Sequence, residues 1–141
     1  MECELLAPVG GESQLEAAIR FGADAVYMGG KRFGLRAYAG NFDDAALRRA
    51  AQYVHKNGKK IYVTLNAYLY NGDLEGVEQA ARALAEAQVD AAIVADPAAV
   101  EICRQVAPEL KLHLSTQANT LNWRAAACWH RQGISRVDLA R

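Results

Sequence analysis

The stretch VYMGGKRFGLRAYAGNF, residues 26–42, holds the side chains in this sequence best suited to binding an anion. It leaves an apolar run at a pair of glycines and then carries three basic residues and no acidic one. Glycine lets a backbone approach a ligand closely, and arginine binds a carboxylate or phosphate through two parallel hydrogen bonds. A solvent-exposed loop whose basic residues are only surface charges is the alternative. The candidate binding residues here are Gly29, Gly30, Arg32, Arg36 and Asn41.

A second polar stretch, HLSTQANTLNW at residues 113–123, contains several uncharged hydrogen-bonding side chains. Such side chains can orient a polar, planar ligand such as a nucleobase, an amide or a sugar. Helix capping by Asn119 or Thr120 is a competing explanation for the second half of the stretch. Capping does not explain the first half as well. The uncharged candidates in this stretch are Ser115, Gln117 and Asn119. Asn66, near the end of an earlier apolar run, is a fourth.

Patterns typical of catalysis or metal binding are not evident. His113 lies two residues before Ser115 and on the same face of a strand, but no acidic residue stands beside it to complete an activated nucleophile. There is no HExxH pattern and no pair of Cys or His at metal-ligand spacing. Asp96 and Asp138 fall near the ends of apolar runs, and Asp96 before Pro97 is explained as a helix N-cap. We therefore assign no catalytic residue and no metal site.

The three cysteines are far apart in the sequence and odd in number: Cys3, Cys103 and Cys128. This pattern is typical of reduced thiols in a cytoplasmic protein. Cys103 and Cys128 fall within helical patterns, so we expect both to be small buried hydrophobic residues.

Short apolar runs must position these side chains. These runs are mostly apolar on both faces, which is typical of parallel strands buried under helices. The runs span residues 4–9, 24–29, 60–67, 90–96, 111–116 and 136–140.

Amphipathic stretches with helical spacing separate the runs, for example Leu47, Ala50 and Val54. Ser13 with Glu16 predicts a capping box at the start of the first helix. Three glycines predict where helices end: Gly22, Gly58 and Gly133.

Six strand–helix units predict an α/β fold of parallel (β/α) repeats, either doubly wound or part of an eight-stranded barrel. The turn after the first run lacks GxGxxG, and polar residues follow almost every run. We therefore predict a partial TIM-type barrel of about six strands, ordered as they occur in the chain. Residues 1–141 contain no linker or low-complexity tract and are expected to form a single domain. We expect Arg36, Asn66, Gln117 and Asn119 to converge at the carboxyl edge of the sheet.

Composition limits the possible partners. The chain has sixteen acidic and sixteen basic residues, so it does not attract nucleic acid through net charge alone. No apolar run approaches the roughly 18 residues that a membrane helix needs, and the N-terminus has acidic residues where a signal peptide has basic ones. We expect a cytoplasmic protein with no membrane partner.

Four segments together resemble the opening part of the collagenase-like proteins of peptidase family U32: ELLAPVGGESQLEAAIRFGADAVYMGGKRFGLRAYAGNF, KIYVTLNA, VDAAIVADP and HLSTQAN. The resemblance keeps their order and spacing and covers essentially the whole chain. It implies that residues 1–141 are the N-terminal portion of a TIM-type barrel in a longer protein of bacterial type. Residues 26–42 would then be a wall of the barrel mouth that holds a substrate or an anionic co-substrate.

The resemblance implies two activities. The family is labelled as a peptidase family, that is, as hydrolases of unsettled catalytic type. Several members instead resemble auxiliary proteins for the oxygen-independent hydroxylation of tRNA, ribosomal RNA or ubiquinone precursors. Those members hold an iron–sulfur cluster on cysteines in the part that would follow residue 141. We therefore expect no cofactor and no activity in this fragment alone. For the full-length protein we expect an iron–sulfur cluster and an RNA or peptide substrate.

The alternative function is a non-catalytic α/β module that binds a phosphate- or carboxylate-bearing ligand through residues 26–42. On either hypothesis, six strands curved for an eight-stranded barrel leave two unpaired edges and an apolar inner face. Such features promote association between chains, so we expect the chain to self-associate.

Overall fold

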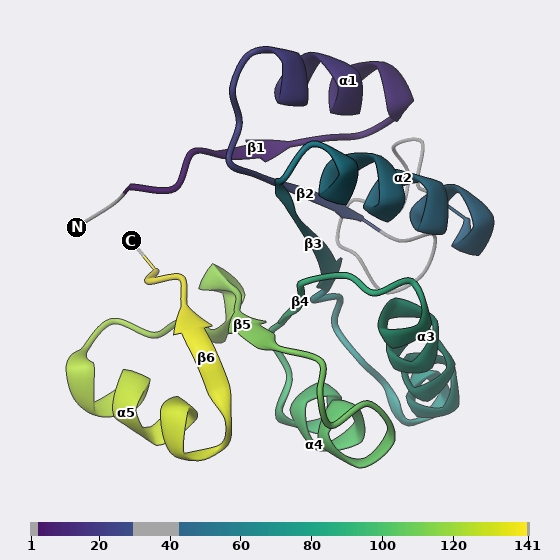
Figure 1. Ribbon diagram of the computed structural model, residues 1–141. Helices are drawn as coiled ribbons and strands as arrows, with labels where there is room; N and C mark the ends of the chain where they lie inside the picture. The colour runs from purple at the N-terminus through teal and green to yellow at the C-terminus, as the bar shows by residue number, and fades with distance from the viewer. Residues whose placement is uncertain (1–2, 30–42, 141) are drawn as a thin grey trace.

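The computed structural model describes residues 3–29 and 43–140, in which strands and α-helices alternate (Figure 1). The strands are β1 (Leu6–Pro8), β2 (Ala25–Gly29), β3 (Lys60–Leu65), β4 (Ala91–Val94), β5 (Leu112–Leu114) and β6 (Ile134–Val137). The α-helices are α1 (Glu12–Arg20), α2 (Asp44–Lys56), α3 (Leu74–Glu86), α4 (Pro97–Val106) and α5 (Trp123–Arg131). Two short 3-10 helices are η1 (Asn71–Asp73) and η2 (Thr116–Ala118). Within these described ranges, no helix is long and apolar enough to cross a membrane.

The six strands form one parallel sheet in the order β1-β2-β3-β4-β5-β6. Figure 1 shows the helices along the outer, convex side of this curved row of strands. A doubly wound sheet would reverse its strand order partway along the chain. The observed order confirms the prediction of parallel (β/α) repeats in a partial TIM-type barrel.

The two sides of the sheet differ because successive side chains of a strand point to opposite faces. On the convex side, residues such as Met28, Ile61 and Val63 are fully buried against the helices and form the main hydrophobic core. The concave side carries a smaller cluster of Ala25, Tyr62, Ala91 and Ile93, with Leu6 and Tyr27 packed against it. The concave side therefore has a smaller apolar cluster than the convex side.

The predicted glycine signals lie at helix ends. Gly22, Gly58 and Gly133 follow α1, α2 and α5 with φ angles of +93°, +69° and +88°, a region that other residues rarely adopt. Asp96 also caps α4 as predicted, because its side chain accepts a hydrogen bond from the backbone N–H of Ala98 at 2.8 Å.

The predicted capping box of Ser13 and Glu16 is wrong. Helix α1 begins at Glu12, two residues earlier than a Ser13 cap requires, and its N-cap is Gly11, which has no side chain to accept a hydrogen bond. Ser13 lies inside the first turn, where its hydroxyl contacts Gln14 Oε1 at 3.4 Å. The first turn therefore forms without side-chain capping.

Candidate functional site

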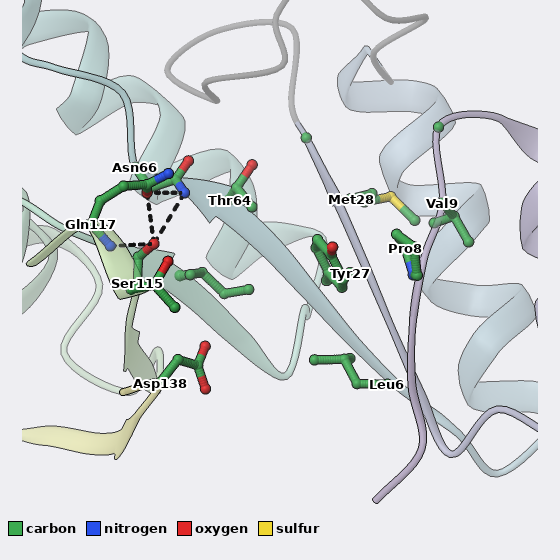
Figure 2. A pocket seen from close by; sticks show the side chains of 14 residues that line it. Leu6, Pro8, Val9, Tyr27, Met28, Thr64, Asn66, Ser115, Gln117 and Asp138 are labelled. Atoms are coloured by element: carbon green, nitrogen blue, oxygen red, sulfur yellow. Dashed lines mark hydrogen bonds between the residues drawn. The ribbon is translucent and has the colours of Figure 1, made fainter. Parts of the chain in front are cut away.

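A pocket of about 630 Å³ opens on the concave side, toward the carboxyl ends of the strands (Figure 2). In parallel α/β folds, this edge of the sheet is where ligands bind. The described residues that line it are Leu6, Pro8, Val9, Gly10, Tyr27, Met28, Gly29, Thr64, Asn66, Ile93, Ser115, Thr116, Gln117 and Asp138.

Three polar side chains on one wall form an amide cluster, consisting of Asn66, Ser115 and Gln117. Asn66 follows β3, whereas Ser115 and Gln117 follow β5. Asn66 Nδ2 donates to Gln117 Oε1 at 2.7 Å and to Ser115 Oγ at 3.3 Å. The Ser115 hydroxyl donates to the same Gln117 oxygen at 2.7 Å. Figure 2 shows these three hydrogen bonds as dashed lines.

The direction of these hydrogen bonds determines what the amide cluster can offer a ligand. Gln117 Oε1 accepts two hydrogen bonds, so the Gln117 amide nitrogen is the part of that side chain available to donate. Asn66 Oδ1 is buried and has no hydrogen-bond partner among the described residues. A buried acceptor without a partner costs free energy unless a ligand or water satisfies it. The cluster thus presents one donor, the Gln117 amide nitrogen, that complements a C=O group of a ligand, whereas Asn66 Oδ1 is shielded within the wall.

The remaining walls are mostly apolar, with the hydroxyl side chains of Thr64 and Thr116 and one carboxylate. Leu6, Tyr27 and Ile93 provide flat, apolar surface, and Asp138, directly after β6, contributes the carboxylate. Burial raises the pKa of Asp138, and the nearby Arg136 guanidinium partly offsets that rise. The sequence placed Asp138 near a strand end but did not identify it as a site residue. Its position near the end of an apolar run was the available signal.

Below the pocket lies a second layer, the floor cluster of Glu4, Tyr62, His113 and Arg136. Each of these residues precedes a pocket residue by two positions and therefore shares its face of the strand or adjoining segment. Glu4 accepts hydrogen bonds from Arg136 Nη1 at 2.6 Å and from the Tyr62 hydroxyl at 2.9 Å. The His113 ring packs edge-on against Tyr62 with ring centroids 4.6 Å apart. The segment before β1 thus contacts β6 across the concave side.

The floor cluster shifts the ionisation of its members. Burial opposes ionisation of Glu4, but the hydrogen bonds from Arg136 and Tyr62 outweigh it and lower the Glu4 pKa. Burial, followed by the hydrogen bond to Glu4, raises the pKa of Tyr62. Burial and the neighbouring Arg136 cation lower the pKa of His113 to about 4. At neutral pH the floor therefore contains an ion pair beside a neutral histidine.

The structure brings together four of the residues that the sequence predicted for the site. Asn66, Ser115 and Gln117 form the amide cluster, and Gly29 lines the same pocket. The remaining candidates of the stretch 26–42 lie outside the described residues: Gly30, Arg32, Arg36 and Asn41. The expected convergence of Arg36 with Gln117 therefore lies outside them as well.

Asn119 is not among the residues that line the pocket. It ends η2 in the left-handed conformation, with φ +53° and ψ +42°, and it is exposed. The prediction that Asn119 or Thr120 caps the following helix is wrong. Helix α5 is capped by Asn122, whose side chain accepts from the backbone N–H of Ala125 at 3.0 Å.

Ser115 and His113 do not form a nucleophile–base pair. The Ser115 hydroxyl donates to Gln117, whereas the His113 ring lies in the floor cluster against Tyr62. General-base activation of a serine needs a direct hydrogen bond to the base. The described geometry therefore gives no support to serine-type catalysis by these two residues.

The described residues do not fit an iron–sulfur cluster. Among them, no three His, Cys, Asp or Glu side chains gather closely enough to hold a metal ion. Cys103 is buried as predicted, and burial raises the pKa of its thiol to about 11, which keeps it protonated. Cys128 is exposed, so the prediction that it is buried is wrong, and Cys3 is exposed as well.

Comparisons with known proteins match this chain to a family. The sequence model of peptidase family U32 matches residues 10–141. A protein named tRNA hydroxylation protein P1 from Bacillus subtilis (strain 168) is 45% identical over 138 residues, which is 98% of this chain and 33% of that protein. A protein named tRNA hydroxylation protein P from Helicobacter pylori (strain ATCC 700392 / 26695) is 38% identical over 141 residues, covering 99% of this chain and 33% of that protein. The chain thus spans about a third of the length of these two relatives.

A solved structure described as a U32 peptidase matches the fold. Its TM-score is 0.77, and the match covers 98% of this chain and 58% of that chain. Sequence identity is 14%, so this likeness concerns the fold alone.

Proposed function

The chain belongs to peptidase family U32, and from this membership we propose that it supplies the ligand-binding barrel segment of a protein that takes part in tRNA hydroxylation. The observation that carries the proposal is the 45% identity, over 138 residues, with a protein named for tRNA hydroxylation. The chain covers only about a third of that protein, so the proposal concerns a segment and not a complete enzyme.

The chemistry of the pocket supports this proposal. A nucleobase is a planar ring with carbonyl groups on its edge, and the amide cluster offers the Gln117 amide nitrogen as a donor to such a group. Tyr27 and the aliphatic side chains beside it provide a surface on which a planar group can pack. An RNA base extruded from its stack is therefore a suitable occupant.

Peptidase activity is the second candidate function, because the matching family and the solved structure carry that name. The described site supports it less well. Ser115, a potential nucleophile, donates its hydroxyl hydrogen bond to an amide oxygen and not to a base. The comparisons also do not favour a free-standing anion-binding module, since they match the chain to members of one family over nearly its whole length.

An iron–sulfur cluster in the full-length protein is a separate proposal, which rests on the family resemblance. Because the described residues do not fit a cluster, we assign no step of the reaction to one. The iron and acid-labile sulfide content of the purified full-length protein would test this proposal directly.

Deletion of the gene in its host, followed by mass spectrometry of nucleosides from total tRNA, tests the proposed function. We expect hydroxylated nucleosides to disappear on deletion and to return with the wild-type gene. Complementation with Gln117→Ala should restore at most about a tenth of the modification, because it removes two hydrogen-bond acceptor contacts and the free donor of the amide cluster.

A matched control is Glu16→Gln, which changes an exposed residue on α1 away from the pocket and should complement fully. In parallel, the purified protein is incubated with fluorescein-labelled gelatin. Unchanged tRNA nucleosides in the deletion strain, together with cleavage of gelatin that Gln117→Ala abolishes, would replace the hydroxylation proposal with the peptidase one.

A further inference from the structure

Asp138 provides the charge of the described pocket wall. Among the described lining residues, it is the one with a carboxyl side chain, and no lysine or arginine is among them. Figure 2 shows its carboxylate directed toward the space between the amide cluster on one side and Leu6 and Tyr27 on the other. Its backbone N–H donates to Leu114 O at 2.9 Å, which fixes the segment after β6 to β5.

The nearby Arg136 does not neutralise this carboxylate fully. Arg136 directs Nη1 to Glu4 at 2.6 Å, whereas its Nε lies 3.5 Å from Asp138 Oδ1, a longer contact. The guanidinium carbon also lies 5.8 Å from the centre of the Tyr62 ring. The floor cluster thus holds Arg136 below the pocket and leaves Asp138 able to accept hydrogen bonds from a ligand.

We infer that Asp138 is a ligand-binding residue that accepts hydrogen bonds from N–H donors of a planar group, and that this wall of the pocket selects cationic and neutral ligands over anions. The amide cluster and Asp138 line the same pocket from different parts of its wall. We therefore expect a ligand of this class to contact both. Arg136, which Glu4 holds, is a positioning residue for Asp138. This inference deepens the proposed function, because it specifies the chemical class of group that enters the same pocket.

Three probes of nearly the same shape and different charge test the inference: benzamidinium, benzamide and benzoate. Each is titrated, at matched ionic strength, into the ¹⁵N-labelled chain while ¹H–¹⁵N correlation spectra are recorded. The side-chain NH₂ signals of Asn66 and Gln117 report binding at this pocket directly. We expect benzamidinium to bind about tenfold more tightly than benzamide, since hydrogen bonds between charged groups are the stronger ones. Benzoate should bind most weakly.

Asp138→Asn keeps the shape of the side chain and removes its charge. We expect it to bring benzamidinium down to the affinity of benzamide. Glu16→Gln makes the same change of charge on the outer helix α1 and should leave the order of affinities unchanged. The comparison of the three probes on the wild-type chain does not depend on the variant being folded.

Three outcomes overturn the inference. Benzoate could bind as tightly as benzamidinium, the order could persist in Asp138→Asn, or no probe could shift the Asn66 and Gln117 signals at millimolar concentration. Because no RNA is used, this experiment can fail while tRNA analysis still supports the proposed function, and the reverse can also occur.

Discussion

At the scale of single residues, His113 links the floor cluster to the stability of the protein. It is 8% exposed, and burial together with Arg136 lowers its pKa from the ordinary 6.5 to about 4. The other charged groups that act on it are Glu4, Lys60 and Lys111. Between about pH 6.5 and about pH 4, the unfolded chain takes up a proton on this residue that the folded chain does not. The free energy of unfolding should therefore fall as the pH falls through this window.

We predict that His113→Phe reduces this acid-induced loss by about 3 kcal/mol, because each pKa unit corresponds to about 1.4 kcal/mol. Phenylalanine retains a ring beside Tyr62 but does not titrate. Urea unfolding of both proteins at pH 7 and about pH 4 measures the difference. Groups that titrate in both proteins cancel. An equal loss of stability in the two proteins would contradict the assignment of a low pKa to His113.

Asn66 supports a prediction about the amide cluster itself. Asn66→Asp replaces the donor of two hydrogen bonds with a carboxylate that faces the acceptor Gln117 Oε1. We expect a loss of about 1–3 kcal/mol in the free energy of unfolding at pH 7, the usual cost of unpaired polar groups in such a site. Chemical denaturation measures it. The loss should shrink in acid, where a protonated carboxyl can donate again; a loss independent of pH would point to altered packing instead.

At the scale of elements, the start of a helix was harder to predict than its existence. Hydrophobic spacing predicted the helices because one face of each must cover the sheet. Asp96 was recognised as a cap because Pro97 follows it directly, whereas α5 had several candidate caps in one polar stretch. The short helix η2 separates β5 from α5 and moves the cap to Asn122. Local preference alone does not reveal such an insertion.

Helix α3 ends differently from α1, α2 and α5. Where those helices are followed by glycine, α3 is followed by the exposed Gln88 at φ +58°. A residue with a Cβ atom is strained by roughly 1–2 kcal/mol in this conformation. We predict that Gln88→Gly raises the free energy of unfolding by about 1 kcal/mol, since the greater freedom of glycine in the unfolded chain offsets part of the relief.

Thermal unfolding followed by circular dichroism checks this prediction as a rise in Tm. Gln88→Ala is the matched control, because it shortens the side chain and keeps the Cβ atom. Alanine should leave Tm nearly unchanged. If alanine and glycine raised Tm equally, the left-handed conformation at this position would not be the cause.

At the scale of the whole molecule, the sequence predicted the fold and one wall of the pocket. The barrel was predictable because apolar runs and helical patterns alternate, and polar residues follow the runs. Asn66 and Gln117 could be assigned to one sheet edge for the same reason. The ion pair of Glu4 and Arg136 could not be predicted, because it joins residues 132 positions apart and depends on the curvature of the sheet. The role of Asp138 depends on that ion pair.

The two ends of the sheet lead to the last prediction, self-association of the 141-residue chain. Within the described residues, β1 and β6 each pair with one neighbouring strand, so each has an edge without a partner strand. Pro8 lacks an N–H and protects part of the β1 edge. Next to β6, Leu139 is 60% exposed and apolar. We therefore expect two copies to associate through the β6 edge, because unprotected edge strands pair with other chains.

Sedimentation velocity over a range of micromolar concentrations tests this expectation. The wild-type chain should show a reversible increase in mass with concentration. Leu139→Lys places a charge next to the β6 edge and should shift the association to at least about tenfold higher concentration, as edge lysines do by opposing strand pairing. Phe21→Lys makes the same change at a residue that is 83% exposed, directly after α1, and should have no effect. A wild-type chain that remains monomeric at every concentration would show that the sheet covers its own edges, and equal effects of the two lysines would show that association does not involve β6.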